Sequence, residues 1–177
     1  MFSINIGIAG EFHVLAQLAQ HGFVASFTLA NTKGIDVIVV NPSLDHFIKL
    51  EVKTTDKPPR KERLFSVDPV YGWPMSEKHE TLSDPRTFYC FVVLQGPSTL
   101  PLFFVVPSSY VAEYVREQHR HWVRTRTEPP DPSNKMRRFR IHPSDPLGFK
   151  DNWKLLGGVS PSPQQCHVME PWVSREP

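Results

Sequence analysis

The spacing of apolar residues divides the chain into predicted helices and strands. Residues 11–21 repeat apolar side chains with the period of an α-helix, which Gly22 ends. Runs of apolar and β-branched residues predict strands at 23–29, 35–40, 47–55, 88–94 and 102–106. A second helix is predicted from Pro107-Ser108-Ser109 to about Trp122.

Charged residues interrupt the strand pair within residues 34–55. Asp36 lies among apolar neighbours, where a carboxylate is costly to bury without a partner. Glu51 and Lys53 are two residues apart on a strand, so they point to the same face, opposite to Leu50 and Val52. If pairing brings Asp36 alongside, two carboxylates and an amine meet at one place. Such a group is typical of a divalent-metal site beside a proton-handling or charge-stabilising residue.

Two simpler interpretations of these residues stay open. An aspartate at the first position of a strand can cap a turn. Lys49, Glu51 and Lys53 can equally form the solvated face of a half-buried strand.

Glu11 is a further acidic residue with two interpretations. At about 100° per residue, its side chain falls inside the apolar arc of the helix, between Leu15 and Leu18. One interpretation is a frayed first residue that favours the positive end of the helix dipole. The other is that Glu11 turns toward a site on the sheet below it.

Composition limits the class of protein. A chain of 177 residues with 40% apolar residues, 21% charged residues and a net charge of +2 is ordinary for one soluble domain. We predict this domain over 1–156 and a flexible, Pro- and Ser-rich tail over 157–177, with Phe149, Trp153 and Leu155 packing back before it. Two cysteines, no leader and no long apolar run predict a cytoplasmic protein that does not enter the membrane.

Basic residues gather in two regions of a chain that has little overall charge. Residues 55–87 are expected to be irregular, with a turn at 71–74 and one short helix at 75–82. Residues 112–140 hold eight Lys or Arg against four Asp or Glu. Both regions can be ordinary solvated surface, or they can contact a nucleic-acid backbone. The predicted contacts are Lys57, Arg60, Lys61, Arg137, Arg138 and Arg140.

The order helix, strand, strand, strand, short helix, strand, with Asp36, Glu51 and Lys53 at these positions, resembles the PD-(D/E)XK nuclease superfamily over residues 10–106. It is most similar to small stand-alone members that begin with a Gly-Glu helix, here Gly10-Glu11. Those members continue to a Phe-rich strand pair ending in a Val-Pro-Ser turn, here residues 103–108. Ile35 replaces the proline of the motif, and only residues 75–82 can supply the expected helix.

The resemblance implies an α/β fold with a restriction-endonuclease-like core, a helix-flanked mixed β-sheet in the order αβββαβ. It also implies that Asp36 and Glu51 bind Mg²⁺ or Mn²⁺, with the Val52 carbonyl as a third ligand. Lys53 is then the lysine of the motif and Glu11 an additional catalytic acid.

The expected function is therefore metal-dependent hydrolysis of phosphodiester bonds in nucleic acid, DNA in preference to RNA. A homodimer is compatible with cutting two strands. Two rivals remain: a catalytically silent module of the same fold that binds nucleic acid or protein, and an interaction protein in which the charged residues form a solvated strand face.

Overall fold

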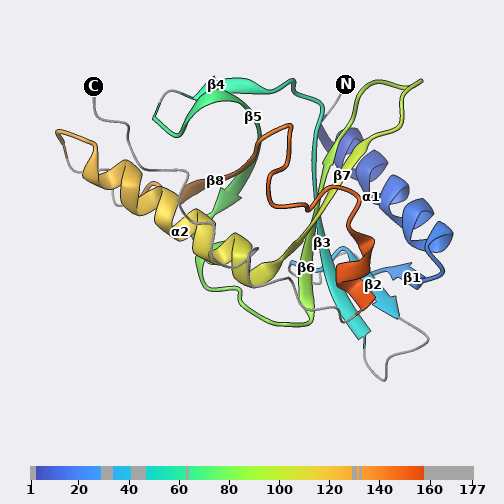
Figure 1. The fold of residues 1–177 in the computed structure, drawn as a ribbon. Helices are drawn as coiled ribbons and strands as arrows, with labels where there is room; N and C mark the ends of the chain where they lie inside the picture. The colour runs from blue at the N-terminus through green and yellow to red at the C-terminus, as the bar shows by residue number, and fades with distance from the viewer. Residues whose placement is uncertain are drawn as a thin grey trace.

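A five-stranded mixed β-sheet runs through the middle of the molecule, with α-helices on both of its faces (Figure 1). The structure, a computed structural model, describes residues 3–28, 34–40, 47–62, 64–128, 131 and 133–157. The fold is mixed α/β, as the sequence predicts.

The strands of this sheet have the order β1-β2-β3-β6-β7. They are β1 (Val24–Phe27), β2 (Val37–Val40), β3 (Phe47–Thr55), β6 (Thr87–Val93) and β7 (Leu102–Pro107). β3 and β6 run parallel, whereas the other neighbours run antiparallel. A parallel pair needs a long crossover connection, and residues 56–86 supply it.

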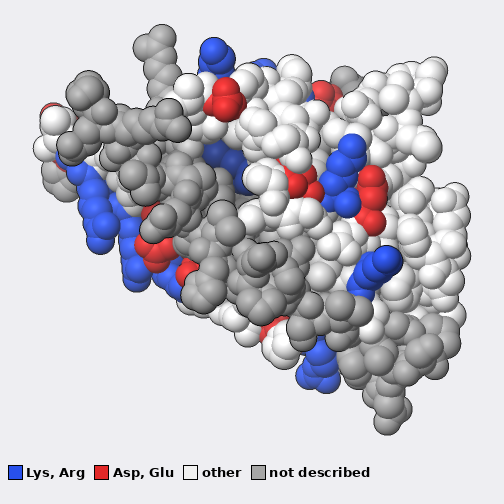
Figure 2. Space-filling view, in the orientation of Figure 1, with Lys and Arg blue, Asp and Glu red and all other residues white. Residues whose placement is uncertain are grey.

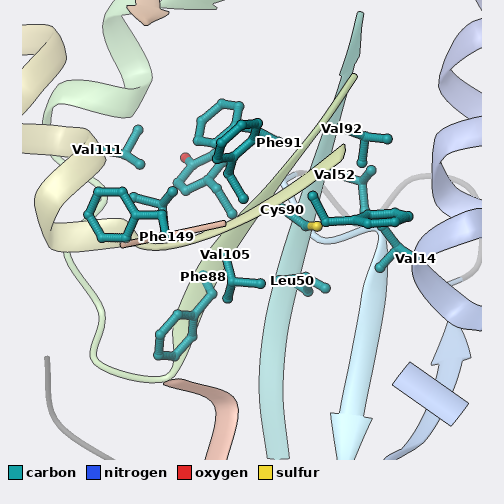
Figure 3. Close-up of a cluster of buried hydrophobic side chains, with 14 of the residues drawn as sticks. Val14, Leu50, Val52, Phe88, Cys90, Phe91, Val92, Val105, Val111 and Phe149 are labelled. Carbon is teal, nitrogen blue, oxygen red and sulfur yellow. The ribbon is translucent and has the colours of Figure 1, made fainter. Parts of the chain in front are cut away.

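The helix α1 (Ser3–Gln20) covers one face of the sheet. Figure 3 shows Val14 of α1 beside Leu50, Val52 and Cys90, and all four side chains are buried. Successive residues of a strand point to opposite faces, so Phe91 points away from α1. Every residue of β6 is buried, which explains its continuous apolar run.

The other face is covered by a helix and a small sheet of order β4-β5-β8. These elements are α2 (Ser108–Arg124), β4 (Arg60–Glu62), β5 (Ser66–Ser76) and β8 (Met136–Ile141). The rings of Phe91 and Phe139 stack with 4.3 Å between their centroids. The indole N–H of Trp73 donates to the Val92 carbonyl at 3.2 Å, so the small sheet is bonded to the large one.

Most elements of the large sheet agree with the sequence prediction. The bounds of β3 are those predicted, and the other strands agree to within a few residues, with Leu29 outside the described part. α1 begins at Ser3 rather than at residue 11. Gly7 and Gly10 lower helix propensity in that first part, so the sequence hides it.

The prediction for residues 55–87 was wrong. The predicted turn at 71–74 lies inside β5, an 11-residue strand. The predicted helix at 75–82 is only a four-residue 3₁₀-helix, η1 (Glu77–Glu80). Pro69 and Pro74 suggested a loop because proline cannot donate to a strand ladder, but β5 tolerates them within a small sheet.

The C-terminal part of the domain packs as predicted. Phe149, Trp153 and Leu155 are all buried, and η2 (Trp153–Gly157) closes the described chain. The predicted tail after Gly157 and the predicted turn at 41–45 lie outside the described residues. Within the described part, neither α-helix has the length and apolar character needed to cross a membrane.

A candidate active site where two strands separate

The candidate site lies where β2 and β3 part. Their pairing ends at Val37 and Leu50, with one further bond from the Asp36 N–H to the Leu50 carbonyl at 3.0 Å. β3 continues to Thr55 beside β6 alone. The Val52 N–H on the open side is satisfied instead by the Asp36 carboxylate, which accepts its hydrogen bond at 2.7 Å. Because the N–H and C=O of one strand residue point to the same side, the Val52 carbonyl faces this opening too.

Strand register brings Asp36, Glu51 and Lys53 together on one face of the sheet. The β2–β3 register, continued by one residue, sets Asp36 opposite Glu51, and Glu51 is paired with Tyr89 of β6. The prediction that Glu51 and Lys53 share a face is confirmed, because their side chains form an ion pair at 2.6 Å. The solvated-face interpretation is wrong for Glu51, whose side chain is only 2% exposed.

The two carboxylate oxygens of Glu51 differ. Oε1 contacts the Lys53 ammonium at 2.6 Å and His79 Nε2 at 3.3 Å. Oε2 is buried and has no hydrogen-bond partner among the described residues. A Cβ placed on Gly34 would lie 3.4 Å from Oε2, so this free oxygen faces the chain just before Asp36. A buried, unpaired carboxylate oxygen is costly, and it is the kind of atom that a cation would satisfy.

His79 is a site residue that the sequence analysis missed. Nδ1 lies 3.0 Å from both the nitrogen and the carbonyl oxygen of Ser76, and Nε2 lies 3.3 Å from Glu51 Oε1. An ionised carboxylate only accepts hydrogen bonds, so Nε2 is the donor to Glu51. Burial alone would raise the pKa of Glu51, but the His79 hydrogen bond and the Lys53 charge outweigh it and lower the pKa to about 2. The spacing of Ser76 and His79 is a capping pattern, and it gave no signal of a contact with Glu51.

The pKa values of Asp36 and Glu11 are raised, whereas that of Glu51 is lowered. Burial raises the pKa of Asp36, the Val52 N–H and Lys53 oppose this, and the Glu51 carboxylate adds to it. Burial also raises the pKa of Glu11, with a second contribution from the charge of Asp36. The site therefore holds one firmly ionised carboxylate beside two that bind protons more tightly than usual.

Glu11 approaches this group from α1, which packs very close to β3 on the face opposite to the Glu51 and Lys53 side chains. A Cβ on Gly10 would come within 1.9 Å of the Thr54 hydroxyl oxygen, so only glycine permits this approach. The frayed-end interpretation of Glu11 is wrong, because α1 begins at Ser3, two turns earlier. The charges of Asp36 and Lys53 both act on the Glu11 carboxyl.

Tyr89 of β6 lies beside Glu51, on the side opposite to Asp36. Burial, followed by the charge of Glu51, raises the pKa of its hydroxyl. Close contact with the Glu51 carboxylate adds to this rise, although the hydroxyl makes no hydrogen bond of good geometry with any described residue. The sequence analysis treated Tyr89 only as part of an apolar strand.

The donor atoms at this opening are oxygens, which fit a hard cation such as Mg²⁺ or Mn²⁺ better than zinc. They are the carboxylates of Asp36 and Glu51 and the carbonyl of Val52. Within the described residues, no three His, Cys, Asp or Glu side chains stand in an arrangement that would hold a metal ion. The observation that favours a cation is therefore the unpaired Glu51 Oε2.

The predicted nucleic-acid contacts do not lie in this group. Lys57, Arg60 and Lys61 are exposed at and before β4. Arg137 pairs with Glu80, whereas Arg138 and Arg140 both pair with Glu62. Besides Lys53, the charge of Lys78 reaches the site: it lowers the pKa of Asp36, and the sequence analysis missed it.

Comparisons of the chain with protein-family models, with curated proteins and with solved structures found no match.

Proposed function

We propose that the protein is a divalent-metal-dependent nuclease that hydrolyses phosphodiester bonds in DNA, on a restriction-endonuclease-like core. The observation that supports it best is Glu51, a buried carboxylate with one oxygen held by Lys53 and His79 and the other unpaired. Asp36, next to it across the strand opening, supplies the second carboxylate.

Asp36, Glu51 and the Val52 carbonyl would hold Mg²⁺ or Mn²⁺. When bound, such an ion offsets charge on the phosphoryl oxygens and makes a bound water more acidic. The division of pKa values in the site suits this role, since Glu51 stays ionised at neutral pH and its unpaired oxygen faces Gly34, just before Asp36.

Lys53 supplies the positive charge beside the scissile phosphate. Its side chain is 28% exposed, so the ammonium lies between buried Glu51 and solvent. From there it can hold a phosphate oxygen and stabilise the negative charge that develops on it. Glu11 is a proton acceptor at the rim of the same site, with its pKa already raised.

The test is cleavage of linear, supercoiled and branched DNA with Mg²⁺ or Mn²⁺, by wild type and by Lys53→Ala. Lys49→Ala is the matched control, because Lys49 is on the same face of β3, is 29% exposed and pairs with Asp84 at 3.1 Å. We expect Lys53→Ala to abolish metal-dependent cleavage and Lys49→Ala to retain it. Unchanged cleavage by Lys53→Ala would refute the assignment of this lysine.

A catalytically silent binding module is the second candidate. It is favoured by the absence, within the described residues, of three acidic or histidine side chains arranged around one point. Calorimetric titration with Mn²⁺ separates the two, using Glu51→Gln and the exposed Asp68→Asn as a control. Mn²⁺ binding that needs Glu51 but not Asp68 supports the nuclease, and no Mn²⁺ binding by wild type supports the silent module.

A further inference from the structure

The densest basic segment of the sequence is largely neutralised in the fold. The four cations at and within β8 each pair with a glutamate, and both oxygens of Glu62 are used. Arg137 and Arg140 are each only 8% exposed, so they have little surface left for a phosphate. The pairs are Lys135 with Glu77, Arg137 with Glu80, and Arg138 and Arg140 with Glu62.

A different row of arginines is exposed along α2. Arg116, Arg120 and Arg124 are spaced four residues apart, so they follow one side of the helix at steps of about 6 Å. Figure 2 shows Lys and Arg side chains gathered along the edge of the molecule that α2 forms, at lower left. Among the ion pairs of the described residues, Glu117 is the one acid that contacts these arginines. Its carboxylate lies 2.6 Å from Arg120 and 3.8 Å from Arg116.

This row begins beside the candidate site. The Arg116 guanidinium donates to the Glu80 carbonyl at 3.2 Å. Glu80 is the residue after His79, whose ring contacts Glu51. Lys78 is exposed on the same 3₁₀-helix. The row of cations thus continues from the site, through η1, onto α2.

We propose that Lys78, Arg116, Arg120 and Arg124 form a track that holds the phosphate backbone of duplex DNA alongside the site. The proposal rests on the proposed function for the choice of polymer, but it concerns binding and not cleavage. The three arginines span about 12 Å of helix, and a DNA strand carries one charge per about 3.4 Å of axis. The track can therefore meet about three phosphates of one strand, independently of base sequence.

The test is binding of a fluorescently labelled 25-base-pair DNA duplex in EDTA, measured by anisotropy between about 50 and 200 mM salt. Arg120→Gln/Arg124→Gln is compared with Lys150→Gln/Lys154→Gln, which also removes two charges. Lys154 follows Trp153, which packs on Phe103 and on His21 of α1. Lys150 follows Phe149, which contacts Tyr110 in the first turn of α2, about 15 Å along the helix from Arg120.

Two lost phosphate contacts should reduce the slope of log affinity against log salt by about 1.8. At about 100 mM salt this corresponds to an affinity lower by about 10- to 100-fold. The control should stay within about twofold of wild type. A third variant, Arg60→Gln/Lys61→Gln, tests the contacts predicted from the sequence.

Equal losses in the α2 variant and its control, no loss in the α2 variant, or no binding by wild type would overturn the proposal. A loss confined to Arg60→Gln/Lys61→Gln would overturn it in favour of β4. If the α2 variant binds weakly as expected but wild type cleaves no DNA with any metal, the track stands and the nuclease assignment fails. If wild type cleaves DNA and the α2 variant binds normally, the nuclease assignment stands and the track fails.

Discussion

Replacing Gly10 with alanine measures how closely α1 packs on β3. The added methyl group would lie 1.9 Å from Thr54 Oγ1 and 2.9 Å from Thr54 Cβ. Rotating the threonine side chain moves Oγ1 but leaves Cβ in place, so the helix or the strand has to shift. Gly7, one turn earlier in α1, has nothing within 4 Å of a Cβ placed on it.

Two opposed effects set the size of the change. Alanine in place of glycine inside a helix stabilises by about 0.5–1 kcal/mol. Forcing an extra methyl group into a packed interface costs about 1–3 kcal/mol. With an overlap this close we use the upper half of that range, so Gly10→Ala should lower the free energy of unfolding by about 1–2.5 kcal/mol. Gly7→Ala should raise it by about 0.5–1 kcal/mol.

Urea unfolding followed by tryptophan fluorescence gives both free energies, with circular dichroism as a second probe. Thr54→Ala in the Gly10→Ala background should recover part of the loss, because Oγ1 and Cγ2 are removed whereas Cβ, 2.9 Å away, remains. Oγ1 has no hydrogen-bond partner among the described residues, so its removal costs little. Equal stabilisation by Gly7→Ala and Gly10→Ala would refute the close approach, and with it the position argued for Glu11.

Three further changes test other parts of the fold. The first is Glu62→Gln. Burial would raise the pKa of the Glu62 carboxyl, but the hydrogen bonds from Arg140 and Arg138 outweigh burial and lower it below the unfolded value of about 4.5. The ionised carboxylate therefore stabilises the fold above pH 4.5, and this stability is lost as the pH falls through the folded pKa. We therefore expect wild type to exceed Glu62→Gln by about 1–3 kcal/mol at pH 7 and the difference to shrink below pH 4.5, in urea titrations across pH; a constant difference would contradict this. His79→Leu should cost about 1.5–3 kcal/mol by urea unfolding, because it deletes a hydrogen bond to an ionised carboxylate, and an unchanged midpoint would argue against that bond. Leu50→Ala at the fully buried centre of β3 should cost about 2–5 kcal/mol in the same assay, and a cost below 1 kcal/mol would place Leu50 outside the core.

The sequence alone predicts the parts of the site that depend on local spacing. Glu51 and Lys53 share a face because strand side chains alternate, and that needs no tertiary information. Asp36 could be placed near them once β2 and β3 were expected to pair. The hydrogen bond from the Val52 N–H to the Asp36 carboxylate, which replaces a bond between strands, could not be predicted because it depends on where β2 and β3 part.

The missed parts depend on contacts between distant residues. His79 reaches Glu51 across 28 positions, from a segment whose strand was hidden by its prolines. The basic segment of β8 was expected to face solvent because a local charge count does not include Glu62. That glutamate lies 76 and 78 residues before Arg138 and Arg140.

The small sheet has a consequence for the order in which the chain can fold. β5 pairs with β8, and β8 follows α2, so residues 60–76 are not a self-contained insertion that could be deleted. During synthesis the large sheet is complete once β7 has emerged, yet Phe91 lacks the ring of Phe139 until β8 arrives. A nascent chain paused between α2 and β8 would expose this aromatic face, and transiently exposed apolar surface is what aggregates or recruits chaperones.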